Sequence, residues 1–152
     1  MAQGIFLIHG AGLPYHVVDI ALHWAGEHDA SLLGIFIYGD QLRGESYGFP
    51  SDIEQVESLN SKHSAQNDLR HLLSGHQQYI EKEAAEAGIE LHTVIIRNPG
   101  DADLQPLFSQ GELVFIDPAT FGDNQQYAAT DFSYGDIVAL CPLPIDEVTD
   151  TL

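Results

Sequence analysis

Two apolar runs near the start of the chain constrain its fold more than any other feature. Residues 4–8 read GIFLI and residues 31–38 read SLLGIFIY. A strand that is apolar at consecutive positions is buried on both faces, which is typical of a parallel sheet covered by helices on each side. Between the two runs, apolar residues recur at the helical period at Leu13, Val17, Ile20 and Trp24. The first 38 residues therefore predict a strand, a helix and a second strand.

The rest of the chain continues the alternation of strands and helices. Residues 39–60 are polar and rich in glycine and proline, which predicts an exposed loop. Apolar residues at helical spacing, Leu72 and Leu73 among them, predict the buried face of a long helix over 62–87, with Gly88 as its stop. Asp103 is the predicted cap of a short helix that ends at Gly111. Further strands are predicted at 89–96, 112–116 and 137–141.

This order predicts one α/β domain in which helices cover both faces of a five-stranded parallel sheet. Ligands of such sheets bind beyond the carboxyl ends of the strands, where the strand order reverses. The polar segments that follow the predicted strands are therefore the candidate rim of a site, namely residues 9–12, 38–40, 97–98 and 117–120.

Composition limits the classes of partner. Of the 152 residues, 44% are hydrophobic, and 23 acidic residues against five Lys and Arg give a net charge of -18. Such a surface repels nucleic acid and anionic membranes. No apolar run approaches the roughly 18 residues of a membrane span, and the first residues do not resemble a signal peptide. With Cys141 as the single cysteine, we expect a cytoplasmic protein.

The segment GESYG, residues 44–48, matches the G-x-S-x-G pattern of a hydrolase nucleophile elbow at Ser46. That elbow needs a strand directly before the serine and a helix directly after it, and polar loop residues stand on both sides here. The triad of that fold also ends with a histidine late in the chain, whereas the last histidine is His92. The two glycines are better interpreted as turn residues of an exposed loop.

Taken in order, five segments cover nearly the whole chain and resemble the universal stress proteins. They are GIFLIHGAG, ALHWAGEHDASLLGIFI, IEKEAAEAGIELHTVIIRNPGDADLQPL, SQGELVFID and DIVALCPLPI. The resemblance implies one domain over residues 1–152, with the strand order 3-2-1-4-5 of the adenine nucleotide alpha hydrolase-like folds. It also implies a homodimer, in which the last strand often pairs between subunits. Pro142 and Pro144 put that pairing in doubt.

The switch point of the predicted sheet places a candidate small-molecule site at the carboxyl ends of strands one and four. The candidate ligand-binding residues are His9, Gly10, Gly12, Ile37, Asp117 and Thr120. Family members that bind ATP carry an aspartate at the end of strand one, where this chain has His9. Their glycine signature after strand four holds phosphates. Residues 117–136 contain only Gly122 and Gly135, at another spacing, together with four aspartates.

Two function hypotheses remain open. The first is a non-enzymatic stress-response or regulatory protein, without a cofactor, that does not bind ATP in the conventional way. The second is a sensor of a nucleotide such as ATP or AMP, or of another small molecule, because Gly10, Gly12 and a helix start still follow strand one.

Weaker signals suggest other sites. Asp19, His23 and Glu27 share one helix face, where two or three such ligands can hold a divalent metal, but a solvated face is the better interpretation. The segment IFIYGD resembles a sulfur-relay family, whose reactive cysteine is expected earlier in the chain than Cys141. Cys141 is better interpreted as a small core residue.

Overall fold

The computed structural model describes residues 2–10, 12–39, 70–121, 130 and 132–149. Five parallel strands form one sheet in the order β3-β2-β1-β4-β5, which confirms the predicted fold class and strand order. The strands are β1 (Gln3–His9), β2 (Ser31–Tyr38), β3 (Leu91–Arg97), β4 (Leu113–Ile116) and β5 (Ile145–Glu147). The strands β1 and β2, which the two apolar runs predict, lie side by side, and β1 is the central strand of the sheet.

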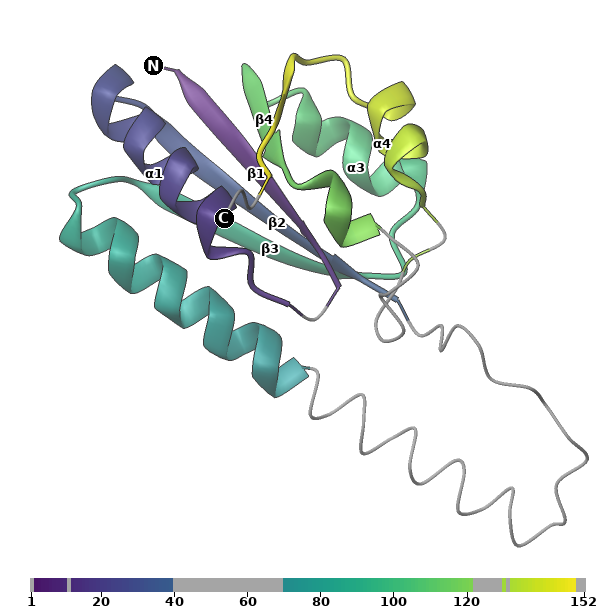
Figure 1. The fold of residues 1–152 in the computed structure, drawn as a ribbon, viewed down its shortest axis with the longest axis horizontal. Coiled ribbons are helices and arrows are strands. Elements are labelled where there is room, and N and C mark those ends of the chain that lie inside the picture. The colour runs from purple at the N-terminus through teal and green to yellow at the C-terminus, as the bar shows by residue number, and fades with distance from the viewer. Residues whose placement is uncertain (1, 11, 40–69, 122–129, 131, 150–152) are drawn as a thin grey trace, which may run out of the picture.

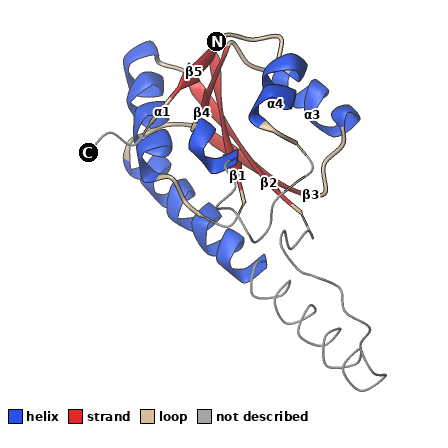
Figure 2. Ribbon diagram, turned by 45° about the vertical axis from the view of Figure 1, so that its right-hand side comes forward, coloured by secondary structure: helices blue, strands red, loops and turns tan. Residues whose placement is uncertain are grey.

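Helices cover both faces of this sheet (Figure 1, Figure 2). On one face lie α1 (Tyr15–His28) and the helix of residues 70–86. On the other face lie α3 (Asp101–Phe108) and α4 (Tyr134–Leu140). The predicted stop of the long helix is confirmed, because Gly88 adopts a φ of 72° and Ile89 N–H bonds the Ala84 carbonyl. The predicted first residues of that helix, 62–69, lie outside the described residues.

The side chains of β1 alternate between two hydrophobic cores. Phe6 and Ile8 pack under α1 and the helix of residues 70–86, whereas Ile5 and Leu7 pack under α3 and α4. Every residue of β1 after Gln3 is buried. The continuous apolar run therefore has the predicted physical cause, which is a strand covered on both faces.

The prediction of a strand at residues 137–141 is wrong. Residues 137–140 belong to α4, and the last strand, β5, begins at Ile145. Ser133 caps α4, since its hydroxyl accepts the Asp136 N–H while the Asp136 carboxylate accepts the Ser133 N–H. This capping box starts a helix although the apolar residues that follow favour a strand. Beyond the helix, the Pro144 carbonyl accepts the Val114 N–H and brings the chain to the sheet edge.

Three helix details also differ from prediction. In α1 the buried residues are Val17, Val18, Ala21 and Ala25, whereas Ile20, predicted on the apolar face, is exposed. The helix of residues 70–86 buries Leu73 and exposes Leu72. Asp103 is not the cap of α3 but accepts the N–H of Gly100, the residue before the helix. Periodicity located α1 and the helix of residues 70–86, but the sheet beneath decided which face of each is buried.

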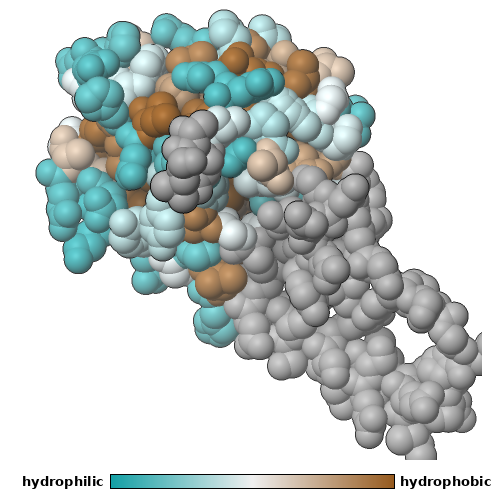
Figure 3. Space-filling model, in the orientation of Figure 1, coloured by the Kyte–Doolittle hydropathy of each residue, from teal (hydrophilic) through white to brown (hydrophobic). Residues whose placement is uncertain are grey.

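Hydrophilic residues occupy much of the face shown in Figure 3, with smaller hydrophobic areas between them. In the described part of the chain, the large hydrophobic side chains that are exposed are Tyr15, Ile20, Leu72, Tyr79 and Val138. Among the described residues, the structure contains no helix with the length and apolar character needed to cross a membrane.

Replacing Gly34 by alanine tests the close packing across the centre of the sheet. A Cβ at Gly34 would lie 2.5 Å from Cζ of Phe6, so the ring and its neighbours must shift. We expect the free energy of unfolding to fall by about 1–3 kcal/mol. The matched control is Gly26→Ala on α1, where a Cβ meets no atom within 4 Å. There we expect a gain of roughly 0.5–1 kcal/mol from helix propensity. Urea unfolding measures the free energy of unfolding of both variants. Equal effects would contradict close packing between Gly34 and Phe6.

The Tyr134 hydroxyl donates a hydrogen bond of 2.7 Å to Glu147 and thereby links α4 to β5. Burial, followed by this bond and the Glu147 charge, raises the pKa of Tyr134 to about 12. The folded state thus holds the phenol proton more tightly than the unfolded state, where the pKa is about 10. This contribution to stability is complete below about pH 10 and is lost as the pH rises toward about 12. Ultraviolet titration should show one tyrosine that ionises near pH 12, and this step should be absent in Tyr134→Phe.

Candidate functional site

The carboxyl ends of β1 and β4 lie next to each other at the point where the strand order reverses. The chain leaves β1 toward β2 on one side, and it leaves β4 toward β5 on the other. Gly10 follows β1 with a φ of 85°, and its N–H donates to the Ile37 carbonyl at 2.9 Å. A side chain would strain this turn. Parallel sheets bind ligands at such a switch point.

His9, the last residue of β1, is buried at 3% exposure. Its Nδ1 lies 2.8 Å from the Thr120 carbonyl, and its Nε2 accepts the Thr130 N–H at 3.1 Å. Because a carbonyl can only accept and a backbone N–H can only donate, this geometry assigns the hydrogen to Nδ1. The ring also stacks on Phe121, with centroids 4.2 Å apart. His9 thus joins β1 to two segments that follow β4.

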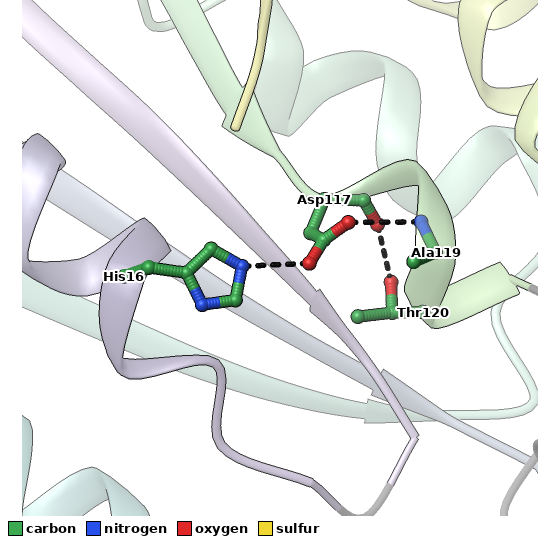
Figure 4. A network of polar contacts seen from close by, with 4 residues as sticks. All are labelled: His16, Asp117, Ala119 and Thr120. Carbon is green, nitrogen blue, oxygen red and sulfur yellow. Dashed lines mark hydrogen bonds and ion pairs between the residues drawn. The ribbon is translucent and has the colours of Figure 1, made fainter. Parts of the chain in front are cut away.

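Asp117, the first residue after β4, is the buried carboxylate of the switch point, at 5% exposure. Its Oδ2 lies 2.6 Å from Nε2 of His16 on the first turn of α1, and its Oδ1 accepts the Ala119 N–H (Figure 4). The Asp117 carbonyl accepts the Thr120 hydroxyl at 2.7 Å. These bonds begin the short 3-10 helix η1 (Pro118–Phe121) and tie it to α1.

A cavity of about 270 Å³ opens between these elements. Its lining is formed by the loop after β1, the first turn of α1 and η1, with His9, Gly12, His16, Asp117 and Thr120 among its residues. We call it the switch-point crevice. Four of the six residues proposed from the sequence line it, namely His9, Gly12, Asp117 and Thr120. Gly10 and Ile37 are not among the lining residues, and the Ile37 side chain packs in the core beneath α3. Ligand contact at all six stays a prediction.

Solved structures with the same architecture carry a family name. A universal stress protein from Lactobacillus plantarum is 13% identical, with a TM-score of 0.58 over 97% of each chain. A universal stress protein in complex with cAMP gives 0.57 at 11% identity, over 99% of this chain and 98% of that one. An Arabidopsis thaliana family member with AMP bound gives 0.51 at 10% identity, over 99% and 93%. No family model and no curated protein matches the sequence.

The chain has the fold of the universal stress proteins. The sequence resemblance is therefore confirmed at the level of the fold, over nearly the whole chain. At these identities the likeness concerns the backbone arrangement, so the chemistry of the site rests on this chain's own residues.

The residue that sequence reasoning missed is His16. It lies two positions after Pro14, in the first turn of the helix that follows β1. His16 lines the crevice. Its short distance in sequence from the proposed residues Gly10 and Gly12 is the signal that could have identified it. Its partner Asp117 is 101 residues away in sequence, so periodicity within one helix does not reveal the pair.

The other sequence candidates lie apart from the crevice. His23 and Glu27 form an exposed ion pair of 3.0 Å on α1, and the described residues contain no group of three or more metal-ligating side chains. Burial raises the pKa of the Cys141 thiol, which favours its less nucleophilic protonated form. Ser46, Gly122, Asp123 and Asp131 lie outside the described residues. Gly135 and Asp136 belong to α4, where Asp136 serves the capping box.

Replacing His16 by alanine tests the bond between α1 and η1. The substitution removes one partner of Asp117, whose side chain is only 7% exposed. We expect the free energy of unfolding to fall by about 1–3 kcal/mol. The matched control is His23→Ala on the same helix, in a pair whose side chains are 76% and 60% exposed. Its effect should stay within roughly 0.5 kcal/mol. Urea unfolding of both variants decides, and similar losses would contradict a structural role for the His16–Asp117 pair.

Proposed function

We propose that this chain is a non-enzymatic, stress-response or regulatory protein of the universal stress protein type that does not bind ATP in the conventional way. The observation that carries the proposal is the state of His9. It stands where the ATP-binding members carry an aspartate, and both of its ring nitrogens are engaged by the chain itself. A buried side chain whose polar atoms are already bonded has little capacity left for a ligand.

The segment after β4 supports the same proposal. Phosphate-binding loops cradle their ligand with successive backbone N–H groups and commonly use glycines to do so. Here Asp117 begins the segment with a buried carboxylate, and Ala119 N–H and Thr120 N–H bond Asp117 rather than a ligand. Triphosphate charge would meet a negative group at this position, which opposes binding.

A second candidate function is a sensor of a nucleotide or another small molecule. The position of the crevice favours it, since a switch point is the usual location of a ligand site, although its volume of about 270 Å³ lies just below the roughly 300 Å³ at which such sites begin. Two proteins with this fold are described as bound to cAMP or AMP, which makes adenine nucleotides the first probes. A serine hydrolase acting through Ser46 and a sulfur-relay protein acting through Cys141 are minor alternatives. For the second, the raised pKa of Cys141 is unfavourable.

The partner and location that we propose are a homodimer in the cytoplasm. Support for a dimer comes from the family resemblance and from β5, which is an edge strand of three residues. Pro144 precedes this edge and Pro142 stands nearby, so pairing through β5 involves a short segment. The single cysteine, which cannot form an internal disulfide, supports a reducing compartment.

Isothermal titration with ATP and AMP, with and without Mg²⁺, tests the proposal. We expect no ATP dissociation constant below about 100 μM, because His9 is committed to the chain and Asp117 repels phosphate. Tighter ATP binding that His9→Ala abolishes would overturn the proposal and establish the sensor. His92→Ala is the control, since His92 is exposed on the edge strand β3 and should leave any binding unchanged.

A further inference from the structure

The switch-point crevice is lined by a buried acidic side chain, Asp117. Asp117 is 5% exposed and lines the cavity together with His16 and Thr120. Its two carboxylate oxygens bond His16 Nε2 and Ala119 N–H. The carboxylate therefore has a fixed position, and the polar bonds that hold it compensate the cost of burying it.

This carboxylate bonds a side chain from the first turn of α1. No acidic residue occupies that turn, and the residue before the helix, Pro14, provides no side-chain cap. The partial positive charge of a helix start favours a nearby anion, and in many α/β proteins a ligand phosphate takes that position. Here the anion that contacts this turn is the Asp117 carboxylate, which bonds the side chain of His16 (Figure 4).

The remaining polar atoms of the crevice suit an uncharged ligand. The His16 ring uses Nε2 for Asp117, and within the described residues its Nδ1 has no protein partner. With the hydrogen on Nε2, the Nδ1 lone pair accepts a hydrogen bond from a hydroxyl or amine. The Thr120 hydroxyl donates to the Asp117 carbonyl and keeps its own lone pairs for a second donor. Leu13, Pro14 and Ala119 add apolar lining.

We propose that the His16–Asp117 pair is a charge filter, which admits small uncharged molecules with hydrogen-bond donors to the switch-point crevice and excludes phosphorylated ones. A second negative charge within about 5 Å of a carboxylate in these weakly polar surroundings lowers affinity by at least about tenfold. The inference rests on the proposed function, for which it supplies the physical cause, and it assigns the determinant to Asp117.

Adenosine and AMP are the probes, because they differ only in the phosphate. Titration calorimetry compares them on the wild-type protein, Asp117→Asn, His16→Gln and a control, Asp19→Asn. Asparagine keeps the shape of Asp117 and removes its charge, while glutamine at position 16 keeps a donor and removes the imidazole. Asp19 is exposed on α1 and is not among the lining residues, so its variant removes one charge from the same helix. Circular dichroism and urea unfolding verify that each variant is folded.

On the wild-type protein we expect adenosine to bind at least about tenfold more tightly than AMP. Asp117→Asn should narrow this ratio by about tenfold or reverse it, and Asp19→Asn should leave it within about twofold. His16→Gln should preserve the ratio, because the Asp117 carboxylate that repels the phosphate is still present. If Asp117→Asn does not fold, the His16→Gln result decides: a narrowed ratio would identify His16 as an anion receptor and overturn the filter.

Three other results would overturn the filter as well. They are a wild-type protein that binds AMP as tightly as adenosine, one that binds neither at millimolar concentration, and a ratio that Asp117→Asn leaves unchanged. The proposed function would fail by a different result, which is tight binding of ATP to the wild-type protein that His9→Ala abolishes. A protein that rejects ATP but shows an unchanged ratio in Asp117→Asn would refute only the filter.

Discussion

The central position of β1 is the constraint on which the rest of the structure depends. It is hydrogen-bonded to β2 on one side and to β4 on the other, so neither edge of the strand is open. Helices on both faces then require every side chain along it to be buried. A strand of this kind can have a polar residue only at its end, where the cover stops. His9 is that residue, and the site grows outward from it.

At the end of β1 the buried polar side chains form hydrogen bonds with other groups of the same chain. His9 donates from one ring nitrogen to a carbonyl and accepts an N–H on the other, while Asp117 bonds His16 and Ala119. Within the described residues, no buried side-chain nitrogen or oxygen is without a partner. In a parallel sheet this is the location where a ligand usually supplies such partners. The same architecture can thus retain a crevice while its own side chains take over part of the ligand's role.

The strand order, and the alternation of strands and helices as far as β4, were predicted because they depend on features that lie close together in sequence or on the resemblance. Continuous apolar runs identify buried strands, and Gly88 marks a helix end through its own backbone conformation. The failure at residues 137–141 has a local cause as well. The apolar residues there favour a strand, but the capping box formed by Ser133 and Asp136 starts a helix. The outcome depended on hydrogen bonds that hydropathy does not record.

By itself the sequence determined that the chain forms a parallel α/β domain, where its first four strands lie and which residues follow the ends of β1 and β4. Those properties rest on local propensity and on the burial that each apolar run demands. Only the tertiary structure decided what these residues do. It placed His16 against Asp117, joined His9 to Thr120 and Thr130, and left Ile37 in the core. The physical reason is that these hydrogen bonds join residues more than 100 positions apart in sequence. Whether such residues meet depends on how the sheet brings the strand ends together, and no local sequence pattern encodes this.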